Sequence, residues 1–185
     1  MLKPKIYVLG PADSFSDLAV RRFRNAKIAY ASSFAVLFKR IQSGSLVLLP
    51  VHNKIIGPIP EVKKYLKTHP VKIMKKFRMP ISFVLASKRK MSLSEVRRIY
   101  SIGPAMDQCK KFLKKYLSSS KKVRVASTAQ AYKKIVQLTA QGAAAIGSLA
   151  GAKSYQLVVL ARQIQDDPKD WTEFVIVKVA TPEAE

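Results

Sequence analysis

The sequence is poor in cysteine, histidine and acidic residues, and it has no long apolar run. The single cysteine, Cys109, cannot form a disulfide within the chain, and one cysteine with two histidines makes a structural zinc site improbable. No apolar run reaches the roughly eighteen residues of a membrane span. Residues 1–9 show neither the apolar core nor the cleavage site of a signal peptide. We therefore expect a cytoplasmic protein with no metal site and no membrane partner.

Eleven Asp and Glu stand against thirty-four Lys and Arg, which gives a formal net charge of +23 at pH 7. A field of this sign attracts phosphates, nucleic acids and small acidic substrates, although it says nothing about the fold. The charge is unevenly placed along the sequence, because residues 63–134 hold twenty-one Lys and Arg and only two acids. We therefore expect one strongly basic lobe, and nucleic acid is a candidate partner of that lobe.

The chain has 185 residues, 48% of them hydrophobic, which is enough for one domain or for two small lobes. Short β-branched runs alternate with amphipathic stretches of helical period, such as the apolar stripe over 105–116. The expected strands lie at 6–9, 46–49, 81–86, 123–125, 143–146, 157–160 and 174–179. Strands that alternate with helices predict α/β layers with mostly parallel sheets.

Small hydroxyl residues gather at three expected strand-to-helix junctions, over 10–16, 101–104 and 127–129. Ligands of open α/β sheets bind beyond the carboxyl ends of the strands, where helix N-termini suit a carboxylate or a phosphate. Ser14 and Ser127 are equally well explained as helix caps that bind no ligand. The junctions together leave an anion site and plain capping as open alternatives.

Six fragments, in order from residue 6 to residue 179, resemble the motifs of one enzyme family. Residues 10–16, Gly-Pro-Ala-Asp-Ser-Phe-Ser, are similar to Gly-Pro-x-Gly-Thr-Phe-Ser, and residues 50–54, Pro-Val-His-Asn-Lys, to Pro-Ile-Glu-Asn-Ser. Ser101 followed by Gln108 and Cys109 is similar to Ser-His-Pro…Gln-Cys. The remaining matches are Ser-Thr-Ala at 127–129, the stretch from 145 to 166, and Thr-Glu-Phe at 172–174 in place of Thr-Arg-Phe. This order and spacing resemble the catalytic domain of prephenate dehydratase.

The resemblance implies a two-lobed α/β fold like that of type 2 periplasmic binding proteins, with the substrate in the cleft between the lobes. Lobe 1 would comprise residues 1–79 with 163–182, and lobe 2, the basic lobe, residues 80–162. It also implies a homodimer, because the family is usually at least dimeric. Many members carry an ACT regulatory domain that binds phenylalanine. We find no such domain in the sequence and expect no feedback through it.

The resemblance further implies a lyase of phenylalanine biosynthesis that converts prephenate to phenylpyruvate with loss of carbon dioxide and water. The family uses no metal and no organic cofactor. A hydroxyl donor can assist the departing hydroxide, and fixed donors can stabilise developing charge. Thr172 would be the hydroxyl nearest the chemistry, with Asn53 and Gln108 orienting the substrate. The implied substrate-binding residues are Ser14, Ser101, Ser127, Thr128 and Lys54.

Three departures from the family pattern leave other functions open. Glu173 replaces the motif arginine, His52 a glutamate and Lys54 a serine. Lys54 or another lysine would then supply the missing cation. Alternatively the chain binds another small anion such as arogenate, or nucleic acid, without catalysis. Asn53, Gln108 and Thr172 together favour the enzyme.

Overall fold

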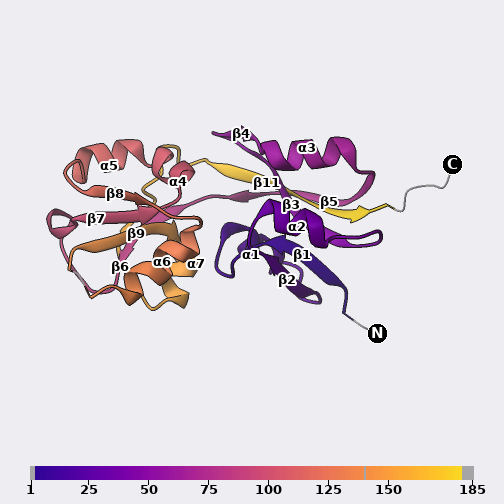
Figure 1. Ribbon diagram of the computed structural model, residues 1–185. Coiled ribbons are helices and arrows are strands. Elements are labelled where there is room, and N and C mark those ends of the chain that lie inside the picture. Colours follow the sequence, from indigo (N-terminus) through magenta and orange to yellow (C-terminus); the bar gives the residue numbers. More distant parts are fainter. Residues whose placement is uncertain (1–2, 140, 181–185) are drawn as a thin grey trace. The chain divides into compact units, whose positions relative to one another are not determined.

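In the computed structural model, which describes residues 3–139 and 141–180, the chain forms two compact units (Figure 1). The first unit contains the described residues up to Pro80 and those from Trp171 onwards, and the second comprises Ile81–Asp170. Residues 163–170, which we expected in the first lobe, belong to the second unit. They are bonded to it through Ile164 N to Phe83 O (3.1 Å) and Asp166 N to Gln108 O (2.7 Å).

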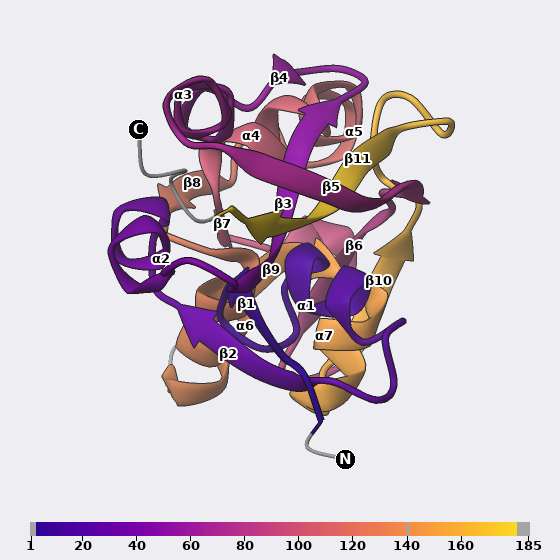
Figure 2. The ribbon, with the colours of Figure 1, turned by 90° about the vertical axis from the view of Figure 1, so that its right-hand side faces the viewer.

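The first sheet joins strands from both ends of the chain. Its order is β2 (Lys27–Ala31), β1 (Lys5–Leu9), β3 (Leu46–Asn53), β11 (Trp171–Val179) and β5 (Val71–Pro80), with the short β4 (Gly57–Pro58) paired to β3. β1 runs parallel to β2 and β3, whereas β11 runs antiparallel to both β3 and β5. Figures 1 and 2 show the yellow β11 beside the purple strands of the first half of the chain.

The second sheet has the order β10 (Val158–Arg162), β6 (Phe83–Ser87), β9 (Ala143–Ser148), β7 (Arg98–Ser101) and β8 (Lys121–Arg124). β7 is parallel to β8 and β9, while β6 is antiparallel to β9 and β10. Both sheets are therefore mixed, and the expectation of mostly parallel sheets is wrong. Apart from the short β3–β4 pair, every antiparallel pair includes β5, β6, β10 or β11, the strands on either side of the two places where the chain passes from one unit to the other.

The helices pack on these sheets. They are α1 (Phe15–Val20), α2 (Phe34–Arg40), α3 (Pro60–Thr68), the 3-10 turn η1 (Leu93–Glu95), α4 (Gly103–Asp107), α5 (Lys110–Tyr116), α6 (Thr128–Gln137) and α7 (Leu149–Ser154). The apolar stripe over 105–116 is divided between α4 and α5 rather than forming one helix. Each unit has its own core, built around Leu37, Val62 and Tyr65 in the first and around Tyr132 and Ile135 in the second. Burying each such side chain stabilises the fold by about 1.5–3 kcal/mol.

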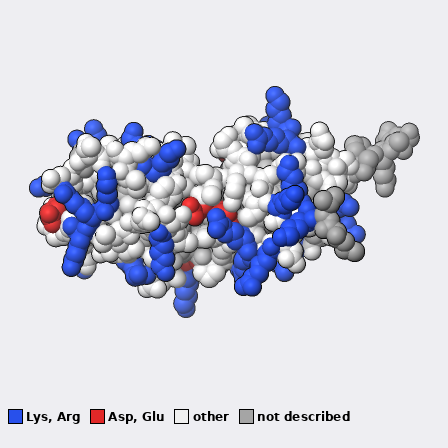
Figure 3. Space-filling view, turned by 90° about the horizontal axis from the view of Figure 1, so that it is seen from below, with Lys and Arg blue, Asp and Glu red and all other residues white. Residues whose placement is uncertain are grey.

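The positive charge is shared by the two units. The second unit holds seventeen Lys and Arg with five acids, and the rest of the chain holds seventeen with six. The second unit is basic, as expected for one lobe, and so is the first, because the basic stretch 63–134 runs across the boundary at Pro80. On the face shown in Figure 3, Lys and Arg are scattered widely and Asp and Glu are few. In the part of the chain that the structure describes, every helix is too short or too polar to cross a membrane.

Candidate active site

Asn53 and Thr172 meet in the first sheet, although 119 positions separate them in the sequence. They are direct partners in the antiparallel ladder of β3 and β11. The amide nitrogen Nδ2 of Asn53 donates to the hydroxyl oxygen Oγ1 of Thr172 and to the backbone oxygen of Trp171, each at 3.1 Å. Both side chains are buried, with 4% and 9% exposure. Neighbouring strands thus hold an amide and a hydroxyl in one fixed arrangement.

The loop after β3 fixes which way the Asn53 amide faces. Its oxygen Oδ1 accepts from the backbone N–H groups of Ile55 and Ile56, both at 3.0 Å. Nδ2 must then face Thr172, since a backbone N–H cannot accept a hydrogen bond. Thr172 Oγ1 accepts this bond, and among residues 3–139 and 141–180 its own proton has no acceptor. The Thr172 hydroxyl is therefore a buried donor with its proton available.

Glu173 is held by two cations of the neighbouring strand. Side chains alternate along a strand, so Glu173 points to the face of the first sheet opposite to Thr172. Its carboxylate lies 2.9 Å from Lys76 Nζ and 3.3 Å from Arg78 Nε, both on β5. The bond from Lys76, followed by that from Arg78, lowers the pKa of Glu173 despite some burial. The guanidinium of Arg78 also lies 4.1 Å from the ring centroid of Trp171. Glu173, which replaces the motif arginine, is thus ionised, and its negative charge is balanced by Lys76 and Arg78.

Gln108 is the main candidate of the second unit. It caps the end of α4 and is 5% exposed, and its side-chain oxygen Oε1 is buried with no donor among the residues described. A buried polar atom without a partner costs about 1–3 kcal/mol, and a ligand that donated a hydrogen bond would recover that energy. The unsatisfied oxygen supports a binding role for Gln108.

The remaining predicted ligands differ in how available they are. Ser101 is fully buried and donates to the backbone oxygen of Ile146 at 2.9 Å, so its proton is already used. Ser14 caps α1 and Ser127 caps α6, accepting from the backbone N–H groups three residues on at 3.2 and 3.0 Å. Thr128 is buried at the first position of α6, and Lys54 is exposed.

A buried acid that the sequence analysis did not single out organises the loop before α1. The carboxylate of Asp17 is inaccessible and accepts from Asp13 N (2.8 Å), Arg21 Nε (2.8 Å) and the hydroxyl of Tyr30 (2.5 Å). Burial first, and then Asp17, raises the pKa of Tyr30 to about 12, so the phenol remains a donor. Asp13 has a positive φ of 67°, where the family pattern has glycine. The bond to Asp17 fixes it there.

The other residues that could carry chemistry, Cys109 and His52, pack against other parts of the protein. Cys109 is fully buried and belongs to the core, and burial raises the pKa of its thiol to about 12, so it is not an activated nucleophile. His52 packs against Trp171 with ring centroids 5.5 Å apart. No group of three or more His, Cys, Asp or Glu able to hold a metal ion occurs in the described parts of the chain.

These features define a structural class first. The chain forms two mixed sheets, and its last strand, β11, belongs to the first sheet. This is the two-lobed α/β fold of type 2 periplasmic binding proteins, as predicted. A solved periplasmic binding protein from Salmonella typhimurium, described as having high arginine specificity, aligns over 97% of this chain and 86% of its own, with a TM-score of 0.50 and 11% identity. At that identity the likeness concerns the fold alone.

The family follows from the sequence. A family model described as prephenate dehydratase matches residues 6–182, and the chain belongs to that family. The bifunctional chorismate mutase/prephenate dehydratase of Enterobacter agglomerans is 27% identical over 94% of this chain and 46% of its own. The prephenate dehydratase of Methanocaldococcus jannaschii is 28% identical over 96% and 65%. The structure of the Arthrobacter aurescens prephenate dehydratase in complex with L-Phe aligns over 98% and 61%, with a TM-score of 0.84 and 25% identity. The chain spans about half the length of the first of these relatives.

Proposed function

We propose that the chain converts prephenate to phenylpyruvate, with release of carbon dioxide and water. The observation that carries this proposal is the pairing of Asn53 with Thr172 in the first sheet. In this reaction the ring carboxylate leaves as carbon dioxide, and its bonding electrons enter the ring as the ring hydroxyl departs. The hydroxyl needs a proton to leave as water. Thr172 is the buried donor whose proton is available for that step.

The Asn53 amide sets the direction of the proton transfer. Because Nδ2 donates to Thr172 Oγ1, the O–H of Thr172 points away from the Asn53 amide and stays free to donate to a substrate. The same donated bond stabilises negative charge that develops on Oγ1 as its proton moves, and solvent then restores the proton. General acid assistance of this kind contributes about 10²- to 10⁴-fold to a rate.

We propose a second set of groups for the substrate itself. In the second unit these are Gln108 Oε1, which lacks a donor, and the Ser127–Thr128 turn, where the N-terminus of α6 favours a carboxylate. Lys54, in the first unit, would supply positive charge. Ser14 and Ser101 would support the loops that carry these groups, since their hydroxyls already make bonds within the protein.

Turnover of prephenate by the purified protein tests this proposal directly. The product is phenylpyruvate, which is followed by its absorbance, and arogenate is assayed beside prephenate under the same conditions. Turnover of prephenate supports the proposal. Turnover of arogenate alone would be consistent with Thr172 as the proton donor, but it would show that the substrate is arogenate and not prephenate. A folded protein that turns over neither would not be a dehydratase.

The Glu173→Arg variant is expected to have a lower kcat/KM than the native protein, by up to about fivefold. A third cation would face Lys76 and Arg78, and Arg78 would lose the partner that holds it beside Trp171, next to Thr172. The pairs are half exposed, so their loss is worth at most about 1 kcal/mol. Glu173→Gln is the matched control, and its kcat/KM should lie between that of the native protein and that of Glu173→Arg. A rise in kcat/KM in Glu173→Arg would instead identify the native glutamate as a handicap.

The alternative of nucleic-acid binding is supported by the stretch 63–134, whose Lys and Arg are mostly exposed. Binding to the phosphate backbone should weaken steeply with salt, with a log–log slope of about −0.9 for each phosphate contacted on B-DNA. A fluorescent duplex titrated at several salt concentrations measures this slope. The even division of charge between the units predicts weak binding without sequence preference.

Homodimer formation and a cytoplasmic location stay predictions. Exposed Ile73 and Met74 on the edge strand β5, at 59% and 52% exposure, are candidates for a contact with a second copy. Sedimentation velocity of the native protein beside an Ile73→Ser/Met74→Ser variant would test that contact.

A further inference from the structure

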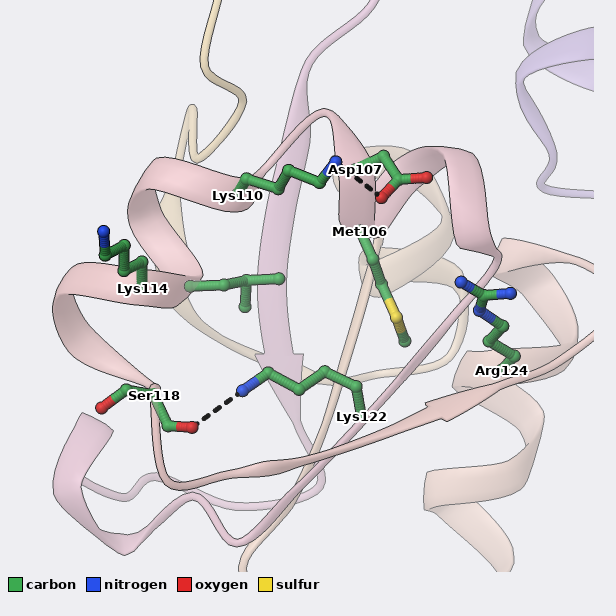
Figure 4. A pocket seen from close by; sticks show the side chains of 8 residues that line it. Met106, Asp107, Lys110, Lys114, Ser118, Lys122 and Arg124 are labelled. Atoms are coloured by element: carbon green, nitrogen blue, oxygen red, sulfur yellow. Dashed lines mark hydrogen bonds and ion pairs between the residues drawn. The ribbon is translucent and has the colours of Figure 1, made fainter.

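The second unit contains a hollow of about 430 Å³ between the α4–α5 segment and the edge strand β8 (Figure 4). Its apolar lining is supplied by Met106 and Leu113, which are 8% and 5% exposed. Its polar lining is dominated by cations, among them Lys110, Lys122 and Arg124. A volume of this size falls in the range of sites for small molecules, and the cations in its lining favour an anionic one.

The two lining cations on β8, Lys122 and Arg124, have exposed side chains. Alternation along β8 turns Val123 to the face of the sheet that packs against the second core, with α6. Lys122 and Arg124 therefore point to the opposite face, towards α4 and α5, and line the hollow there. Figure 4 shows Met106 directed into the space between them.

Lys122 and Arg124 are not paired with acidic side chains of the described residues. The single acid of the lining, Asp107, lies 3.3 Å from Lys110 Nζ, and neither Lys122 nor Arg124 forms an ion pair among the residues described. Lys122 Nζ donates to the backbone oxygens of Leu117 and Ser118, at 2.9 and 3.0 Å. Two of its three donors are thus used to fix the ammonium at the end of α5, and one remains.

We propose that this hollow binds a small organic anion, with an apolar body against Met106 and Leu113 and a phosphate or carboxylate between Lys122 and Arg124. Arg124 presents a planar guanidinium that suits a bidentate contact with either group. Lys122 presents an ammonium that is already held in place, so less conformational freedom is lost on binding. The site lies wholly within the second unit and does not depend on Thr172 or Asn53.

Isothermal titration calorimetry of the full chain tests this site, with phenyl phosphate and 3-phenylpropionate as probes. We expect saturable binding of at least one probe, and the tighter probe identifies the preferred anionic group. The variant Lys122→Gln/Arg124→Gln should raise the Kd at least tenfold. Arg162→Gln, which removes an exposed arginine from β10 outside the hollow, should leave the Kd unchanged. Circular dichroism checks that each variant is folded.

Three results would overturn the proposal. The first is an absence of saturable binding of both probes to the native protein. The second is an equal loss of affinity in Arg162→Gln, which would show that the attraction of the probe to the positive surface is general. The third is binding of inorganic phosphate as tight as that of phenyl phosphate, because the apolar wall would then contribute nothing. In any of these cases Lys122 and Arg124 would serve only to keep the edge strand from pairing with another chain.

Discussion

Replacement of Thr172 by alanine should lower the turnover of prephenate by roughly 10²- to 10⁴-fold, with little change in KM. The methyl group of alanine cannot supply a proton to the departing hydroxide, whereas the Thr172 hydroxyl is a buried donor. The loss should fall on kcat, because the hydroxyl acts as the carbon–oxygen bond breaks and contributes less to binding. Stopped or continuous assays of phenylpyruvate give both constants.

Thr172→Ser is the matched control. Serine keeps the hydroxyl and its bond from Asn53 but loses the methyl group of a residue that is only 9% exposed. We expect Thr172→Ser to keep turnover within about tenfold of the native protein, while Thr172→Val, which has the shape without the hydroxyl, behaves like alanine. Turnover by Thr172→Ala within a factor of about ten of the native rate would show that Thr172 is not the general acid.

Replacement of Asn53 by alanine is expected to damage both stability and turnover. The Asn53 side chain accepts from two backbone N–H groups of the following loop and donates to Thr172 Oγ1. Alanine removes all of these bonds at once and leaves partly buried donors unsatisfied. The free energy of unfolding should fall by about 1–3 kcal/mol, and turnover should fall at least tenfold. Urea unfolding and the phenylpyruvate assay measure the two effects.

Asn53→Asp separates these two effects. Aspartate keeps an oxygen for the N–H groups of Ile55 and Ile56, so it should lose less stability than alanine. It replaces the Nδ2 donor by a carboxylate oxygen, to which Thr172 would turn and donate its own proton. We therefore expect turnover to be lost although the loop stays in place. An Asn53→Asp variant with native turnover would contradict the role assigned to the Asn53 amide.

The fold and one part of the site could be predicted from the sequence. The two-lobed class and the family are confirmed, because the motifs stand in order along nearly the whole chain. The partners of Glu173 could not be foreseen, since they lie on β5. Most side chains of that strand are exposed, so it lacks the alternation of apolar and polar residues that marks a strand. Lys76 and Arg78 were therefore seen only as part of a basic stretch.

The division of the stripe over 105–116 into two helices was hidden for a related reason. Ala105, Cys109 and Leu113 are all buried, so α4 and α5 turn their apolar side chains inward without a change of period at the break. Periodicity reports which side of a segment is buried, and it does not report where the backbone stops being helical. The unsatisfied Oε1 of Gln108 lies at that break and was visible only in the structure.

The return of β11 into the first sheet bears on the order in which the protein is made. Synthesis proceeds from the N-terminus, and the domains of a chain generally fold as units. The second unit is continuous from Ile81 to Asp170 and is complete before Trp171 leaves the ribosome. The first unit must wait, with β3 and β5 lacking the strand that joins them. The half of the chain that is synthesised first is thus the last to close, and the arrival of Thr172 both finishes that fold and supplies its reactive hydroxyl.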